Sequence, residues 1–136
     1  MDDSKFLGKD AADGSHTWKE WHIQSYISTQ SHRGGYMFSA GMEGASKGKA
    51  GGAKAKATGQ QAGEPDLRYY LDGGKLVLIE LKTISGKLSK IQKERISALR
   101  KLGFNVCIVY AESPMHGWTQ VKHILENGLI NIGDIR

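Results

Sequence analysis

The 136-residue sequence has one cysteine and no long apolar run. Cys107 has no internal partner, so an intramolecular disulfide is excluded, and the thiol is expected to pack as a small hydrophobic group in a reducing compartment. No segment approaches the roughly 18 apolar residues of a membrane-spanning helix. The polar first residues, MDDSKFLGKD, do not resemble a signal peptide. We therefore expect a soluble, intracellular (cytoplasmic) protein.

The sequence also lacks metal-ligand spacing among its histidines, which we interpret as ordinary surface or packing residues: His16, His22, His32, His116 and His123. A metal site in this chain would need oxygen ligands, which Mg²⁺ accepts from one or two carboxylates together with water and phosphate.

Charge of one sign is in excess. The 19 lysines and arginines outnumber the 14 acids and leave a net charge of +5. Such a surface attracts polyanions, of which nucleic acid is the commonest, although lysine also serves solubility alone. The length corresponds to a single domain spanning residues 1–136.

The first 31 residues divide into a polar arm and an amphipathic helix. Residues 1–15 are predicted to form a flexible arm, and residues 16–31 to form a helix with Ile23, Tyr26 and Ile27 on one arc. Glu20 falls beside that arc. Either its carboxylate faces the core because the site needs it there, or the helical phase is assigned wrongly, or its side chain extends to the edge of the core.

After a short predicted strand at residues 36–40, residues 41–63 contain seven glycines and four lysines, Lys47, Lys49, Lys54 and Lys56. We expect a mobile basic loop that follows a phosphate backbone, or else a solvated linker.

Two predicted strands, 66–71 and 75–82, form a hairpin around Asp72-Gly73-Gly74. A two-residue loop would place Asp66 and Glu80 on opposite faces of the sheet. A three-residue loop pairs residue 71 with 75, and therefore Asp66 with Glu80, and the two glycines favour this turn. Lys82 then points to the same face.

Paired acids on neighbouring strands repel each other, so this register calls for a cation, most simply a divalent metal. The run 76–79 is apolar on both faces, which indicates a central strand. An exposed ion pair between Glu80 and Lys82 is the alternative, but it leaves Asp66 and the apolar flank unexplained.

A second helix is predicted from the cap Ser89 to about residue 102, with Leu88, Ile91, Ile96, Leu99 and Leu102 on its inner arc. Gln92 lies within that arc, and it either completes a capping box with Ser89 or faces the site. A strand at 104–110, parallel to 75–82, follows. Beyond Pro114 comes a helix with an apolar stripe for the core or a dimer contact: Trp118, Val121, Ile124 and Leu125. Residues 129–136 form either an edge strand or a tail.

The order of these motifs resembles the PD-(D/E)XK nuclease superfamily, and within it the VRR-NUC family of small phage and bacterial nucleases. The resemblance rests on residues 53–67, Ile79-Glu80-Leu81-Lys82, residues 86–89 and Gln92, and reaches back to Glu20. It covers about residues 16–112 and implies an α/β, restriction-endonuclease-like αβββαβ core with a mixed central sheet flanked by helices.

The resemblance further implies Mg²⁺- or Mn²⁺-dependent cleavage of DNA phosphodiesters. Asp66, Glu80 and the Leu81 carbonyl would hold the metal, and Lys82 would orient the attacking water or stabilise the charged transition state. Glu20 would hold a metal-bound water or a second ion, and Gln92 would position the nucleophile or DNA. Lys87 and Lys90 join the four loop lysines as expected DNA contacts.

Stand-alone VRR-NUC proteins resemble dimeric Holliday junction resolvases, so we expect a homodimer acting on branched DNA. The alternatives are a nuclease of the same fold acting on flaps, nicks or linear duplex, and a basic DNA-binding module that does not cut.

Overall fold

A computed structural model of the chain describes residues 18–41, 54, 56–127 and 134–135. The elements, in chain order, are α1 (Glu20–Arg33), β1 (Met37–Ala40), β2 (Leu67–Leu71), the short turn η2 (Asp72–Gly74), β3 (Lys75–Thr83), α3 (Lys90–Lys101), β4 (Asn105–Ala111), α4 (Pro114–Asn127) and β5 (Asp134–Ile135). The expected αβββαβ order is confirmed. The predicted arm at 1–15 and the lysines Lys47 and Lys49 lie outside the described residues.

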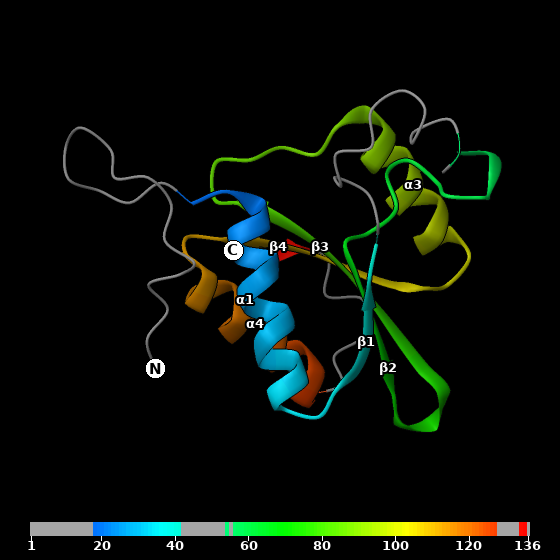
Figure 1. The fold of residues 1–136 in the computed structure, drawn as a ribbon. Coiled ribbons are helices and arrows are strands. Elements are labelled where there is room, and N and C mark those ends of the chain that lie inside the picture. The colour runs from blue at the N-terminus through cyan, green and yellow to red at the C-terminus, as the bar shows by residue number, and fades with distance from the viewer. Residues whose placement is uncertain (1–17, 42–53, 55, 128–133, 136) are drawn as a thin grey trace, which may run out of the picture.

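The five strands form one mixed sheet in the order β1-β2-β3-β4-β5 (Figure 1). The pairs β1–β2 and β2–β3 are antiparallel, whereas β3–β4 and β4–β5 are parallel. Every residue from 77 to 82 is buried, so β3 is a central strand covered on both faces, as predicted. Of the segment 129–136, the described residues Asp134–Ile135 form the edge strand β5, which pairs with β4.

Helices cover the two faces of the sheet unequally. α1 and α4 pack on one face, where alternate residues of β3 meet Ile23, Ile27 and Val121 in the larger core cluster. α3 alone packs on the other face, where Ile96 meets Leu78 and Ile108. The stripe on α4 belongs to the core, with Val121, Ile124 and Leu125 buried and Trp118 partly buried against them. Among the described residues, every helix is too short or too polar to span a membrane.

α1 begins later than predicted. Trp18 and Lys19 are not helical, and the helix starts at Glu20, where the Lys19 N–H donates to Nδ1 of His22 at 2.9 Å. The predicted start at residue 16 is therefore wrong, because a side-chain cap at residue 22 ends the helical pattern that periodicity alone extends upstream. Glu20 consequently lies in the first turn of the helix.

The inner arc of α3 is narrower than predicted. Ile96 is buried and Leu88 and Leu99 are partly buried, but Ile91 is 53% exposed and Leu102 is 75% exposed. At about 100° per residue, Ile91 and Leu102 lie roughly 140° and 120° away from Ile96, outside the stripe that one sheet face can cover.

The hairpin turn has the predicted length. Leu71 pairs with Lys75, so the loop consists of Asp72, Gly73 and Gly74. Gly73 and Gly74 have positive φ angles, +77° and +73°, a backbone conformation that residues with a side chain rarely adopt. The three-residue turn, and with it the register on which the site depends, is confirmed.

The backbone comes unusually close to α3 at Gly63. Its φ is +82°, and a β-carbon there would lie 2.8 Å from the carbonyl oxygen of Ile91.

Gly59 also has a positive φ, +96°, but a β-carbon there would meet nothing within 4 Å. We expect Gly59→Ala to cost only about 1–2 kcal/mol of conformational strain, and Gly63→Ala to cost at least about 1 kcal/mol more. Urea denaturation measures both values, and equal losses would contradict the close approach.

Candidate active site

Two carboxylates lie opposite each other where β2 begins and β3 approaches its end. Leu67 pairs with Ile79, so the next pair in the same register is Asp66 with Glu80. Oδ2 of Asp66 accepts a hydrogen bond of 2.7 Å from the Leu81 N–H, which fixes the aspartate against the neighbouring strand. Glu80 is fully buried. The structure thus brings together the two acids that the hairpin register predicted.

Burial and proximity make both acids hard to ionise. Desolvation is the largest cause of a raised Glu80 pKa of about 9, and the negative charge of Asp66 adds to it. The Asp66 pKa is also raised, chiefly by burial, although the Leu81 N–H stabilises the ionised form and offsets part of that effect. A cation placed between the two groups would relieve both penalties.

The donor set fits a hard divalent ion. Oε2 of Glu80 is buried and has no hydrogen-bond partner among the described residues, so one carboxylate oxygen is available as a ligand. In the described part of the chain, no group of three or more His, Cys, Asp and Glu side chains is placed to hold a metal. A site here would therefore combine two carboxylates with a main-chain carbonyl, water and substrate oxygen, the donors that Mg²⁺ and Mn²⁺ accept.

Gln92 serves as helix cap and as site residue at once. Its Oε1 accepts from the Ser89 N–H at 2.9 Å, and the Ser89 hydroxyl accepts from the Gln92 N–H at 3.1 Å, which completes a capping box. Its Nε2 donates to Oε1 of Glu80 at 3.2 Å. Because the capping bond occupies the amide oxygen, the NH₂ group must face Glu80. The two roles left open by the sequence are therefore compatible.

Lys82 and Glu20 form an ion pair beside the acids. Nζ of Lys82 lies 3.3 Å from Oε1 of Glu20, and the lysine side chain is 7% exposed while the glutamate is 45% exposed. The carboxylate of Glu20 therefore lies at the edge of the core and not inside it, because Glu20 is in the first turn of α1. Glu20 belongs to the site through Lys82.

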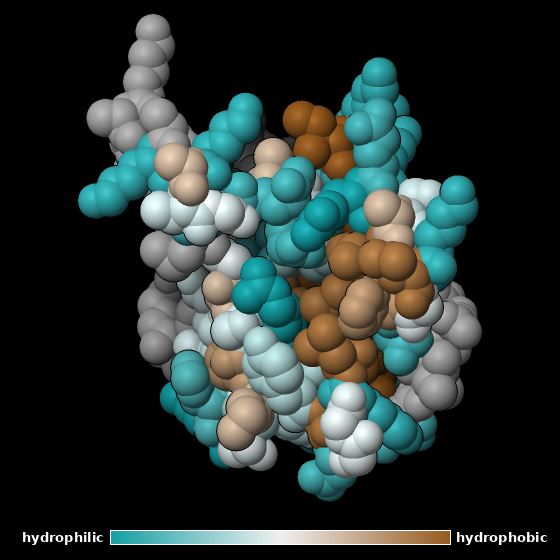
Figure 2. Space-filling model, turned by 90° about the vertical axis from the view of Figure 1, so that its right-hand side faces the viewer, coloured by the Kyte–Doolittle hydropathy of each residue, from teal (hydrophilic) through white to brown (hydrophobic). Residues whose placement is uncertain are grey.

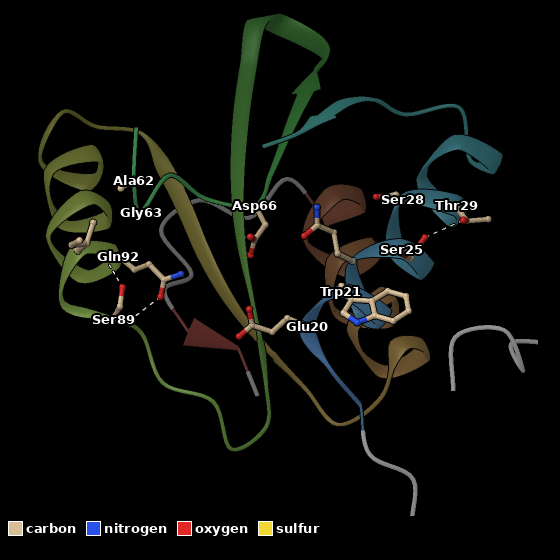
Figure 3. Close-up of a pocket in the computed structure, with 12 residues that line it drawn as sticks. Glu20, Trp21, Ser25, Ser28, Thr29, Ala62, Gly63, Asp66, Ser89 and Gln92 are labelled. Atoms are coloured by element: carbon tan, nitrogen blue, oxygen red, sulfur yellow. Dashed lines mark hydrogen bonds between the residues drawn. The ribbon is translucent and has the colours of Figure 1, made fainter. Parts of the chain in front are cut away.

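An open cleft of about 790 Å³ lies between α1 and α3, and Glu20, Asp66 and Gln92 line it, whereas Glu80 and Lys82 are buried and do not. Figure 3 shows Asp66 and Glu20 pointing into its centre, Gln92 and Ser89 on the α3 side, and Trp21, Ser25, Ser28 and Thr29 on the α1 side. A cleft open to solvent, with acids at its base, admits an extended ligand.

Two contributions were not foreseen from the sequence. Glu64 forms an ion pair of 2.8 Å with Arg95 of α3, which ties the segment before Asp66 to that helix. The two residues lie 31 positions apart in sequence, and no local pattern identifies such a pair. Trp21, which is 59% exposed, lines the cleft, and only its position next to Glu20 could have indicated this.

Four of the six lysines expected to contact DNA are described, and all four are exposed: Lys54, Lys56, Lys87 and Lys90. Lys54 and Lys56 belong to a helical turn in which the Thr58 N–H donates to the Lys54 carbonyl at 3.0 Å. The described end of the expected basic loop is thus locally ordered. DNA contact by these lysines stays a prediction.

Comparison with solved structures found two with a similar fold. One, described as a VRR-NUC domain protein, superposes with a TM-score of 0.61 at 22% identity, covering 88% of this chain and 94% of its own. The other, described as a VRR-NUC domain, has a TM-score of 0.53 at 22% identity, covering 81% of this chain and 97% of its own. The chain has the VRR-NUC domain fold. The resemblance drawn from the sequence motifs is confirmed in this respect.

Comparison by sequence with family models and with curated proteins found no match. The VRR-NUC likeness of this chain is therefore carried by its fold and by the motif positions named above.

The raised carboxyl pKa predicts how the metal-free protein responds to pH. Glu80 ionises near its ordinary value of 4.5 when unfolded but near 9 when folded, so folding takes up a proton between these values. The stability that this proton contributes is complete below about pH 4.5 and is lost as pH rises towards 9, with a slope of at most about 1.4 kcal/mol per pH unit. Glu80→Gln should flatten this slope. Urea denaturation in EDTA across this range measures it, and identical slopes in both proteins would contradict the assignment.

Proposed function

We propose that this protein is a metal-dependent DNA endonuclease that acts on branched DNA. The observation that carries the proposal is the pair formed by half-buried Asp66 and fully buried Glu80, with the Lys82–Glu20 ion pair beside it, next to an open cleft that Asp66 and Glu20 line. Carboxylate ligands next to a lysine suit phosphodiester hydrolysis, in which a metal and a cation stabilise developing negative charge. The VRR-NUC domain fold and the excess of basic residues support nucleic acid as the substrate.

Asp66, Glu80 and the Leu81 carbonyl would hold Mg²⁺ or Mn²⁺. When bound, such an ion supplies polarisation of the scissile phosphate and lowers the pKa of a water molecule. Asp66 is oriented for this task by the Leu81 N–H, and Glu80 by Gln92, so both carboxylates are held before a ligand arrives.

Lys82 would contribute the positive charge that faces the phosphate. Its side chain is buried, and its ammonium group pairs with Glu20, which lines the cleft, so the charge is already positioned and the side chain loses little freedom on binding. The half-exposed carboxylate of Glu20 would serve in addition as the acceptor for a water molecule or a second ion.

The first test concerns the carboxylates. Asp66→Asn and Glu80→Gln should each lower Mg²⁺- or Mn²⁺-dependent cleavage by at least about 100-fold, because each removes a ligand charge. Saturating Mn²⁺ should stabilise the wild-type fold, by about 2.7 kcal/mol at 100 times Kd, and should do so far less in either variant. Asp72→Asn in the exposed turn is the matched control. Gel cleavage assays and thermal melts provide the two measurements.

The same assay separates the candidate substrates when labelled four-way junction, flap, nicked and linear duplex DNA are compared. Preferential cutting of the junction supports the branched-DNA proposal, and equal cutting of all four contradicts it. Metal-independent DNA binding without any cleavage would favour the basic module that does not cut.

We further propose that the protein acts as a homodimer, as symmetric cleavage of a junction requires. Figure 2, which views the side of the molecule at the right of Figure 1, shows apolar side chains gathered there. The end of α3 lies on that side in Figure 1, and Leu102 and Phe104, which follow the helix, are 75% and 41% exposed. Exposed apolar side chains on one side of a protein indicate an interface, and we propose that a second copy covers them.

Leu102→Glu should therefore weaken self-association, because it places a charge in a face that must lose water on dimerisation. Sedimentation velocity should show a wild-type dimer and a shift of the variant towards monomer by at least about tenfold in Kd. Met115→Glu, at a 48% exposed position on α4, controls for added charge. A wild-type monomer at all concentrations would contradict the dimer.

A further inference from the structure

The wall of the cleft carries an exposed indole beside the proposed chemistry. Trp21 follows Glu20 in the first turn of α1, is 59% exposed and lines the cleft together with Asp66 (Figure 3). The larger part of the tryptophan surface thus remains in water, although this residue type is usually well buried. Neither metal binding nor charge stabilisation uses it.

The indole is held in place from behind. It stacks on the ring of His22, with centroids 3.9 Å apart and an interplanar angle of 30°. His22 is itself 6% exposed, and its Nδ1 accepts from the Lys19 N–H, so the platform beneath the indole is fixed by burial and by a hydrogen bond. A rigid aromatic surface loses little conformational entropy when a ligand binds to it.

The surroundings suit a nucleotide as a whole. On the opposite wall, Ile91 is 53% exposed and Gly63 adds no side chain, while Ser89 and Gln92 supply polar groups. Beyond Trp21, the α1 wall carries the short neutral hydroxyl groups of Ser25 and Ser28. These groups can bond to sugar and phosphate oxygens without adding negative charge.

We propose that this cleft binds an unpaired deoxynucleotide next to the scissile phosphate, with its base stacked on Trp21. A base inside a duplex is covered on both faces by its neighbours, so away from a duplex end a nucleotide has to be unpaired or splayed out to stack on the indole. The inference rests on the proposed nuclease function and deepens it, because it names the substrate as DNA that contains an unpaired nucleotide at a branch, fork or end. A duplex without such a nucleotide would reach the carboxylates less readily.

The test is DNA binding in EDTA, where no metal-dependent cleavage occurs. The probes are single-stranded oligodeoxythymidylate and a blunt duplex with the same number of phosphates. Trp21→Ala should weaken binding of the single strand by about five- to hundred-fold and binding of the duplex by less than about twofold. Trp21→Phe should recover most of the loss, since it retains a smaller aromatic face. Tyr70→Ala, at a 47% exposed position on β2 outside the cleft, is the matched control and should change neither.

Tryptophan fluorescence separates stacking from a structural role, because DNA changes the emission of Trp21 only if it binds next to the indole. The chain has three tryptophans, so a Trp18→Phe, Trp118→Phe protein reports Trp21 alone. The single strand should quench this emission and the duplex should quench it far less, because stacking requires a free base. Equal quenching by both probes, or none by either, would overturn the proposal. So would equal loss of single-strand and duplex affinity in Trp21→Ala, which would indicate a general structural role.

The two proposals fail in different ways. If the wild-type protein cleaves DNA with Mn²⁺ but neither quenching nor selective loss of single-strand binding is seen, only the stacking inference is wrong. If the single strand quenches Trp21 and no divalent ion supports cleavage of any DNA, the nuclease proposal is wrong while the nucleotide site stands.

Discussion

The placement of two carboxylates directly opposite each other on neighbouring strands is the constraint on which the rest of the site depends. Asp66 is half-buried and Glu80 is fully buried, the two repel each other and both have raised pKa values, so the fold has to hold them against an electrostatic penalty. It does so with one donor each, the Leu81 N–H for Asp66 and the Gln92 amide for Glu80. Such a pair is unfavourable on its own and becomes favourable when a cation binds between the two groups.

The charges around this pair come from two layers of the molecule. Lys82 stands on the same strand as Glu80, and Glu20 reaches it from the first turn of α1. When all are ionised, the carboxylates of Asp66, Glu80 and Glu20 carry three negative charges, and Lys82 carries one positive charge. The net charge of −2 matches one divalent ion. The Glu64–Arg95 ion pair adds no charge to this balance and instead ties the strand entry to α3.

Much of this arrangement could be predicted from the sequence, because it depends on local rules. The register of Asp66 and Glu80 follows from the length of a glycine-rich turn, and the capping box of Ser89 and Gln92 follows from their spacing. Helix ends were less predictable. The start of α1 depends on a bond between Lys19 and the side chain of His22, which periodicity does not reveal.

Contacts between distant segments could not be predicted in the same way. The partner of Arg95 is Glu64, and the close approach of Gly63 to Ile91 joins two segments that only the tertiary fold brings together. The sequence shows which side chains of α3 are apolar but not how wide a strip of the sheet one helix covers. The predicted inner arc of α3 is therefore too wide, because it includes Ile91 and Leu102, which are exposed.

The turn at Asp72–Gly74 makes the site sensitive to chain length at a place far from the chemistry. The turn begins six residues beyond Asp66, roughly 20 Å away along β2 at about 3.3 Å per residue. Because side chains alternate between the two faces along a strand, a one-position shift in the pairing of β2 with β3 would turn Glu80 and Lys82 to the opposite face relative to Asp66. The tip therefore helps to set the geometry of the site through its backbone conformation, although nothing at the tip touches the cleft.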